Sequence, residues 1–291
     1  MNWSGSAAGL GLLSAASWGG SDFIGGLGAR RAPVFLIVVS GHFVTLLALL
    51  AISLGGRFPL PGSHDLLFAA AGGFEGALAL AMFYRALAMG AMGLTAALTG
   101  LLTAMIPVLF SLLEDGLPSS AGALGLAMGL AAVWLITDAP EAHAATGNAH
   151  CRPPRTPPRA LLLGTLAGLG FGAQLVLFKF AAGGGILWIM TSARAAGVTA
   201  MLLVILFSPP ARPWQGFWLY GTLAGAFDTA GNLLYIEATR FGRLDLAAVI
   251  CSLYPAGTIL LAALVFRERP TGRQFAGMAL ALTAVVLLSV Q

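Results

Sequence analysis

The stretch "DAPEAHAATGNAHCRPPRTPPRA", at residues 138–160, is the one long polar connector in an otherwise apolar sequence. Its Pro, Ala and Arg content leaves it little surface to bury, so we expect a mobile linker. It falls near the middle of the 291-residue chain. The sequence therefore predicts two units of similar length, residues 1–137 and 161–291.

The composition on both sides of this linker is that of a membrane protein. Charged residues make up only 9% of the chain and hydrophobic residues 58%, against about 25% charged residues in an ordinary soluble domain. Mean hydropathy is +0.89. So few charges cannot cover the surface of a soluble protein of this size, whereas lipid replaces water around a membrane protein. Basic residues form no cluster with interleaved aromatics, so we expect a lipid bilayer and no nucleic acid as partner.

Apolar runs between the Pro, Gly and charge clusters are long enough to cross a bilayer, which takes about 20 residues. The expected spans are residues 5–27, 33–54, 66–88, 92–113, 120–137, 160–181, 186–207, 214–238, 243–265 and 272–290. Five precede the linker and five follow it. The predicted fold class is an all-α, polytopic membrane protein with ten transmembrane helices, and the even number places both termini on one side.

The two halves resemble each other. "GGFE" (72–75) matches "GAFD" (225–228) at a displacement of 153 residues, and "ALAMG" (86–90) matches "ATRFG" (238–242) at 152. A shift of 152 also places His42 over Arg194. Because five spans is an odd number, the second half must enter the membrane from the opposite face. Inverted repeats are typical of secondary transporters, whose substrate site lies near the midplane between the repeats.

Two further stretches carry a resemblance to a known family. "SWGGSDF" (17–23) and "SLYPAGTILLAALVFRERPTGRQFAGMAL" (252–280), in a chain of ten spans, resemble EamA-type members of the drug/metabolite transporter superfamily. The resemblance covers essentially the whole chain. It implies export of a small metabolite, amino acids among them, or of a drug. Asp22 stands where such proteins often carry Asn, and His42 where they often carry Arg, which leaves the substrate open.

Five ionisable residues lie deep within the expected spans, namely Asp22, His42, Glu75, Arg194 and Asp228. A charge at the bilayer centre costs about 2.5–3.5 kcal/mol on insertion scales. These side chains must therefore face a wet cavity, pair with one another or stay neutral. One interpretation is a translocation cavity that they line, and the other is an ion-paired structural core.

The chemistry of these groups predicts different roles. Arg194 could hold a substrate carboxylate or neutralise an acidic neighbour through two parallel hydrogen bonds. Glu75, Asp228 and Asp22 are candidates for proton coupling, because a desolvated carboxyl group can bind and release a proton. His42 could titrate near neutrality or pack as a neutral residue.

Three uncharged residues complete the expected cavity lining. Asn232 lies four residues after Asp228, and with Tyr235 these residues share one face of the eighth span. Trp18 and Tyr254 could stack on a flat or apolar substrate, with packing in the core or at the membrane interface as the alternative. We therefore expect Trp18, Asn232 and Tyr254 beside the five ionisable residues.

The sequence thus predicts a secondary transporter that exports a small organic, amino-acid-like metabolite or a drug by alternating access, either coupled to protons or by facilitated diffusion. Two alternatives stay open: a non-transporting sensor or assembly subunit with a structural polar core, and an intramembrane enzyme that uses Ser21 and His42. No HExxH, Walker A or dinucleotide motif is present, and the two cysteines have no metal-ligand spacing. We expect neither cofactor nor metal.

Fourteen of the fifteen basic residues are arginine, which indicates a GC-rich bacterial genome and hence the inner membrane of a bacterium. Loops after odd-numbered spans hold ten basic residues and loops after even-numbered spans hold four. Positive residues favour the cytoplasm, so this count places both termini outside. The family resemblance implies the opposite orientation, and both remain open.

Overall fold

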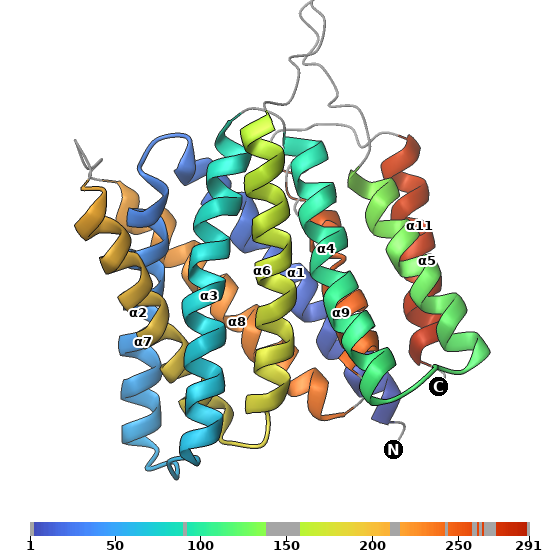
Figure 1. The fold of residues 1–291 in the computed structure, drawn as a ribbon, viewed down its shortest axis with the longest axis horizontal. Coiled ribbons are helices and arrows are strands. Elements are labelled where there is room, and N and C mark those ends of the chain that lie inside the picture. Colours follow the sequence, from blue (N-terminus) through green and yellow to red (C-terminus); the bar gives the residue numbers. More distant parts are fainter. Residues whose placement is uncertain are drawn as a thin grey trace, which may run out of the picture.

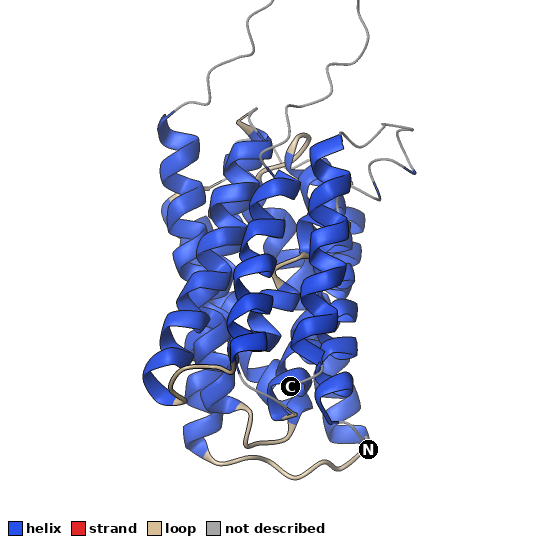
Figure 2. Ribbon diagram, turned by 90° about the vertical axis from the view of Figure 1, so that its right-hand side faces the viewer, coloured by secondary structure: helices blue, strands red, loops and turns tan. Residues whose placement is uncertain are grey.

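Helices that run side by side make up the molecule (Figures 1 and 2). The computed structural model describes residues 3–89, 92–137, 158–209, 216–241, 244–257, 261, 264 and 272–289. Within these ranges every regular element is a helix and none is a strand. The predicted all-α fold is confirmed.

Each of the ten expected spans overlaps a described helix. The helices are α1 (Trp3–Ala29), α2 (Val34–Gly55), α3 (Ser63–Ala88), α4 (Met92–Glu114), α5 (Ser120–Thr137), α6 (Pro158–Ala181), α7 (Ile186–Phe207), α8 (Phe217–Arg240), α9 (Leu244–Cys251) and α11 (Gly272–Ser289). Helices α2, α3, α6 and α7 are long and apolar enough to cross a membrane, and shorter apolar helical stretches occupy Thr99–Glu114, Ser120–Leu135 and Leu244–Gly257. Large apolar side chains such as Leu67 and Leu206 are exposed, as lipid contact requires.

Helix α6 starts inside the predicted linker. It begins at Pro158, whereas the sequence predicts a linker up to residue 160. Proline suits the first turn of a helix because its missing N–H group has no partner there in any case. Residues 138–157 of the linker lie outside the described residues.

The ninth span is interrupted before Pro255. Helix α9 ends at Cys251, and a turn at Ser252 and Leu253 separates it from a short helical stretch over residues 254–257. Pro255 has no N–H group to donate to the preceding turn, so the helix breaks ahead of it. This break lies beside α1, because a Cβ on Gly257 would lie 3.4 Å from the Gly19 Cα atom.

Helices of one half pack mainly on helices of the other. Helix α1 packs on α8 and α6 packs on α3, while α2 contacts α7 and α8, and α3 contacts α7. Helix α6 is the fifth helix after α1, and α8 is the fifth after α3. The α1–α8 contact and the α6–α3 contact are therefore the same contact in the two repeats. Helix α1 begins at the edge where α6 ends (Figure 1), so these related helices run in opposite directions. The two halves therefore share one helical body and do not form separate bundles.

Two helix crossings bring backbones into direct contact. A Cβ on Gly225 of α8 would overlap the Gly41 Cα of α2, and a Cβ on Gly73 of α3 would overlap the backbone of Ala193 in α7. Gly41 and Ala193 are 152 residues apart, as are Gly73 and Gly225. The crossings thus repeat with the displacement found in the sequence.

Candidate functional site

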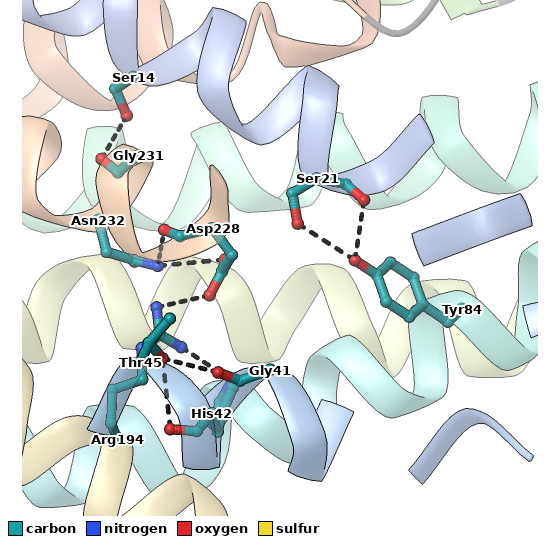
Figure 3. A network of polar contacts seen from close by, with 10 residues as sticks. All are labelled: Ser14, Ser21, Gly41, His42, Thr45, Tyr84, Arg194, Asp228, Gly231 and Asn232. Carbon is teal, nitrogen blue, oxygen red and sulfur yellow. Dashed lines mark hydrogen bonds and ion pairs between the residues drawn. The ribbon is translucent and has the colours of Figure 1, made fainter. Parts of the chain in front are cut away.

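A buried charged network joins α2, α7 and α8 next to these crossings (Figure 3). The Nη2 atom of Arg194 lies 2.6 Å from Oδ2 of Asp228. The Nη1 atom of Arg194 donates a hydrogen bond to Nε2 of His42 over 2.8 Å. Arg194 and His42 are only 3% and 4% exposed. The ion pair therefore lies in the core, where breaking it by removal of one partner costs about 3–5 kcal/mol.

The contact with Arg194 fixes the protonation of His42. A guanidinium group has only donors, so Nε2 of His42 must accept and the imidazole must be neutral with its proton on Nδ1. That Nδ1 atom is buried against Gly197 of α7 and has no hydrogen-bond partner among the described residues. The network accordingly holds one positive charge, on Arg194, and one negative charge, on Asp228.

Asn232 holds the carboxylate of Asp228 in place. Its Nδ2 atom donates to the backbone oxygen of Asp228 over 2.8 Å and to Oδ1 over 3.2 Å. One carboxylate oxygen thus faces Asn232 and the other faces Arg194. The Oδ1 atom of Asn232 is buried without a hydrogen-bond partner in the described part of the chain.

A small cavity adjoins the network on the side of α1 and α3. Its volume is about 10 Å³, room for about one water molecule. Its lining includes Ser21, His42, Tyr84 and Asp228. The Tyr84 hydroxyl donates to the backbone oxygen of Ser21 and lies 3.2 Å from its Oγ atom. Sequence reasoning missed Tyr84, although a tyrosine inside an apolar span signals a buried hydroxyl that needs a partner.

Aromatic side chains gather where α1, α8 and the break after α9 meet. The ring of Trp18 lies 5.9 Å from that of Tyr235 and 6.5 Å, edge-on, from that of Tyr254. One turn earlier on α1, the Ser14 hydroxyl donates to the backbone oxygen of Gly231 over 2.8 Å (Figure 3). Trp18 and Tyr254 are therefore neighbours in the structure.

Asp22 lies one turn beyond Trp18 on α1 and is partly exposed. Its carboxyl group is close enough to that of Asp228 for the two charges to repel each other, and the preceding residue, Ser21, contacts Tyr84. No hydrogen bond or cationic partner of Asp22 is found within the described ranges. Asp22 thus adjoins both the charged network and the aromatic group.

Glu75 lies apart from the network. A Cβ on Gly170 of α6 would overlap the Glu75 carboxylate. The Oε2 atom of Glu75 is buried with no hydrogen-bond partner among the described residues. The helix contacts follow the 152-residue shift, under which Gly76 and not Glu75 corresponds to Asp228. The match of "GGFE" with "GAFD" is displaced by one further residue, and one residue turns a helix by about 100°.

The structure also bears on the alternative of an intramembrane enzyme that uses Ser21 and His42. Ser21 Oγ contacts Tyr84 and His42 Nε2 contacts Arg194, so the nucleophile and base imagined for an enzyme are each engaged elsewhere. Within the described residues, no three His, Cys, Asp or Glu side chains come together as metal ligands would.

The chain resembles a known protein family and a solved structure. The EamA-like transporter family matches residues 158–290, which confirms the resemblance over the second half of the chain. A solved structure described as "Crystal structure of protein" is 20% identical, covers 97% of this chain and 96% of that chain, and has a TM-score of 0.71. At this identity the likeness shows the fold alone. A search of curated proteins gives no match.

Proposed function

Because residues 158–290 match the EamA-like transporter family, we propose that the protein is a secondary transporter that exports a small organic metabolite or drug by alternating access. The observation that carries this proposal is the network of Arg194, Asp228 and His42, to which both halves of the chain contribute. A polar site between oppositely oriented halves is where such transporters bind substrate. We place it in the inner membrane of a bacterium.

Polar atoms without partners support a binding role for this network. His42 Nδ1, Arg194 Nε and Asn232 Oδ1 are buried without hydrogen bonds within the part of the chain that is described. Buried polar groups in native proteins are nearly always satisfied, so such a group needs water, ligand or a second conformation. Three in one network are typical of a site that exchanges partners. Direct backbone contact at the glycine crossings leaves few interlocking side chains to prevent α2 and α8 from moving.

Flux measurements separate this function from that of a structural polar core. Purified protein in proteoliposomes is tested with a panel of metabolites and drugs, together with Arg194→Met, Asp228→Asn and the double variant. Transport predicts that each single variant lowers flux at least about tenfold, the effect of 1.4 kcal/mol, and that the double variant regains stability without regaining flux. Intact flux in both single variants, with lost stability that the double variant regains, would establish a structural pair.

Proton coupling is expected to pass through Asp22 and Asp228. A pH gradient should then drive substrate flux, substrate should drive proton flux, and Asp22→Asn and Asp228→Asn should each abolish the coupling. Glu75→Gln serves as a comparison, because Glu75 lies outside the network. Flux that ignores the pH gradient in the wild type and in all three variants contradicts coupling and leaves facilitated diffusion.

A further inference from the structure

The charge balance around Asp22 singles out one class of substrate. Arg194 is neutralised by Asp228 at 2.6 Å, and His42 is neutral because it accepts from Arg194. Asp22 has no cationic partner among the described residues. A carboxyl group surrounded by helices is stable only when it is protonated or when it binds a cation. Among the described residues, the site therefore has an acidic group without a cationic partner and no unmatched positive charge.

The position of Asp22 does not require a charge for packing. Helix contacts repeat at a shift of 152 residues, and that shift relates Asp22 to Gln174 of α6. The side-chain amide of Gln174 lies where a Cβ on Gly76 of α3 would be, while Asp22 interacts with Asp228 of α8. A neutral amide fills the corresponding place in the other half, so the carboxylate is a feature of the α1 side alone.

Aromatic side chains lie in the neighbourhood of Asp22. Tyr84 of α3 contacts Ser21, the residue before Asp22. Trp18 lies one turn away on the same face of α1, and its ring is 6.5 Å from that of Tyr254. Aromatic faces attract cations, most strongly where water is excluded. An acidic group with three aromatic neighbours suits a cation that carries an apolar or aromatic body.

We propose, on the basis of the transport function above, that the substrate is an organic cation that binds Asp22 beside Trp18, Tyr84 and Tyr254. A substrate carboxylate would have to displace Asp228 from Arg194 and would then face the carboxylates of both Asp22 and Asp228. Arg194 accordingly holds Asp228 in place, and the charged group of the substrate contacts Asp22.

Three probes with the same benzyl group test this proposal. Benzyltrimethylammonium is permanently positive, benzyl alcohol neutral and phenylacetate negative. Binding to the purified protein is measured by tryptophan fluorescence and by calorimetry. The cation should bind at least about tenfold more tightly than benzyl alcohol, and phenylacetate most weakly. Asp22→Asn should remove the preference for the cation and leave benzyl alcohol binding unchanged, while Glu75→Gln retains the preference.

Equal or tighter binding of phenylacetate, an unchanged cation preference in a folded Asp22→Asn protein, or binding of none of the probes overturns the proposal. Thermal unfolding and size-exclusion profiles establish that Asp22→Asn is folded, and Asp22→Glu, which keeps the charge, should retain the preference. The flux assay keeps the two proposals apart. Flux of a neutral or anionic compound that is independent of Asp22 overturns the cation site alone. Asp22-dependent cation binding without flux of any compound overturns transport alone.

Discussion

Replacing Asp228 with alanine is expected to lower the free energy of unfolding by about 3–5 kcal/mol. The substitution leaves the guanidinium group of Arg194, which is 3% exposed, without its counter-charge in the core. The hydrogen bond to the neutral His42 cannot replace the ionic partner. Reversible unfolding in mixed micelles, followed by circular dichroism, measures the loss.

The double variant Arg194→Met/Asp228→Ala is expected to be more stable than the Asp228→Ala variant. It removes the buried cation together with its partner, and buried ion pairs can often be exchanged for apolar groups at little cost. Glu237→Ala provides the matched control, because Glu237 and Arg240 form an exposed pair on α8, worth about 0.3–0.5 kcal/mol. Strictly additive losses in the double variant would show that Arg194 and Asp228 do not stabilise each other.

The helices could be predicted from the sequence because lipid imposes a simple rule on it. A span needs about 20 apolar residues with all backbone groups bonded internally, so apolar length indicates both helix and boundary. The unusual cost of buried charge likewise indicated Arg194 and Asp228 as candidate site residues. The start of α6 at Pro158 departs from the predicted end of the linker, because proline suits the first turn of a helix.

Which polar groups meet could not be predicted, because that depends on helix pairing and rotation. Nothing in the pattern of apolar residues along the sequence indicates that α1 packs on α8 and α3 on α6. An alignment error of one residue was enough to equate Glu75 with Asp228, although their helices present them in different directions. Tyr84 was missed for the same reason, since its partner Ser21 is 63 residues away. The repeat in the sequence indicated a displacement of 152 or 153 residues between the halves. The contacts between helices show that it is 152.

The Gly225→Leu substitution is expected to destabilise the protein by about 1–3 kcal/mol and to abolish transport. A Cβ at this position would overlap the backbone of Gly41, and a backbone atom cannot rotate away as a side chain can. Helices α2 and α8 must therefore move apart, and an overpacked contact of this kind carries that cost. The separation also carries His42, next to Gly41, away from the α8 residue Asp228, so the charged network should be disturbed as well.

Comparison with Gly73→Leu and Gly9→Ala shows whether close backbone contact is the cause. Gly73 makes the equivalent crossing against Ala193 of α7, so its substitution should cost about as much as that of Gly225. No atom of the described residues lies within 4 Å of a Cβ added to Gly9 of α1, so Gly9→Ala should raise stability by up to about 1 kcal/mol through helix propensity. Unfolding and flux are measured on all three proteins. Gly225→Leu protein with wild-type stability and flux would mean that the α2–α8 crossing is not a close contact in the membrane. The charged network would then need another means of joining the two halves.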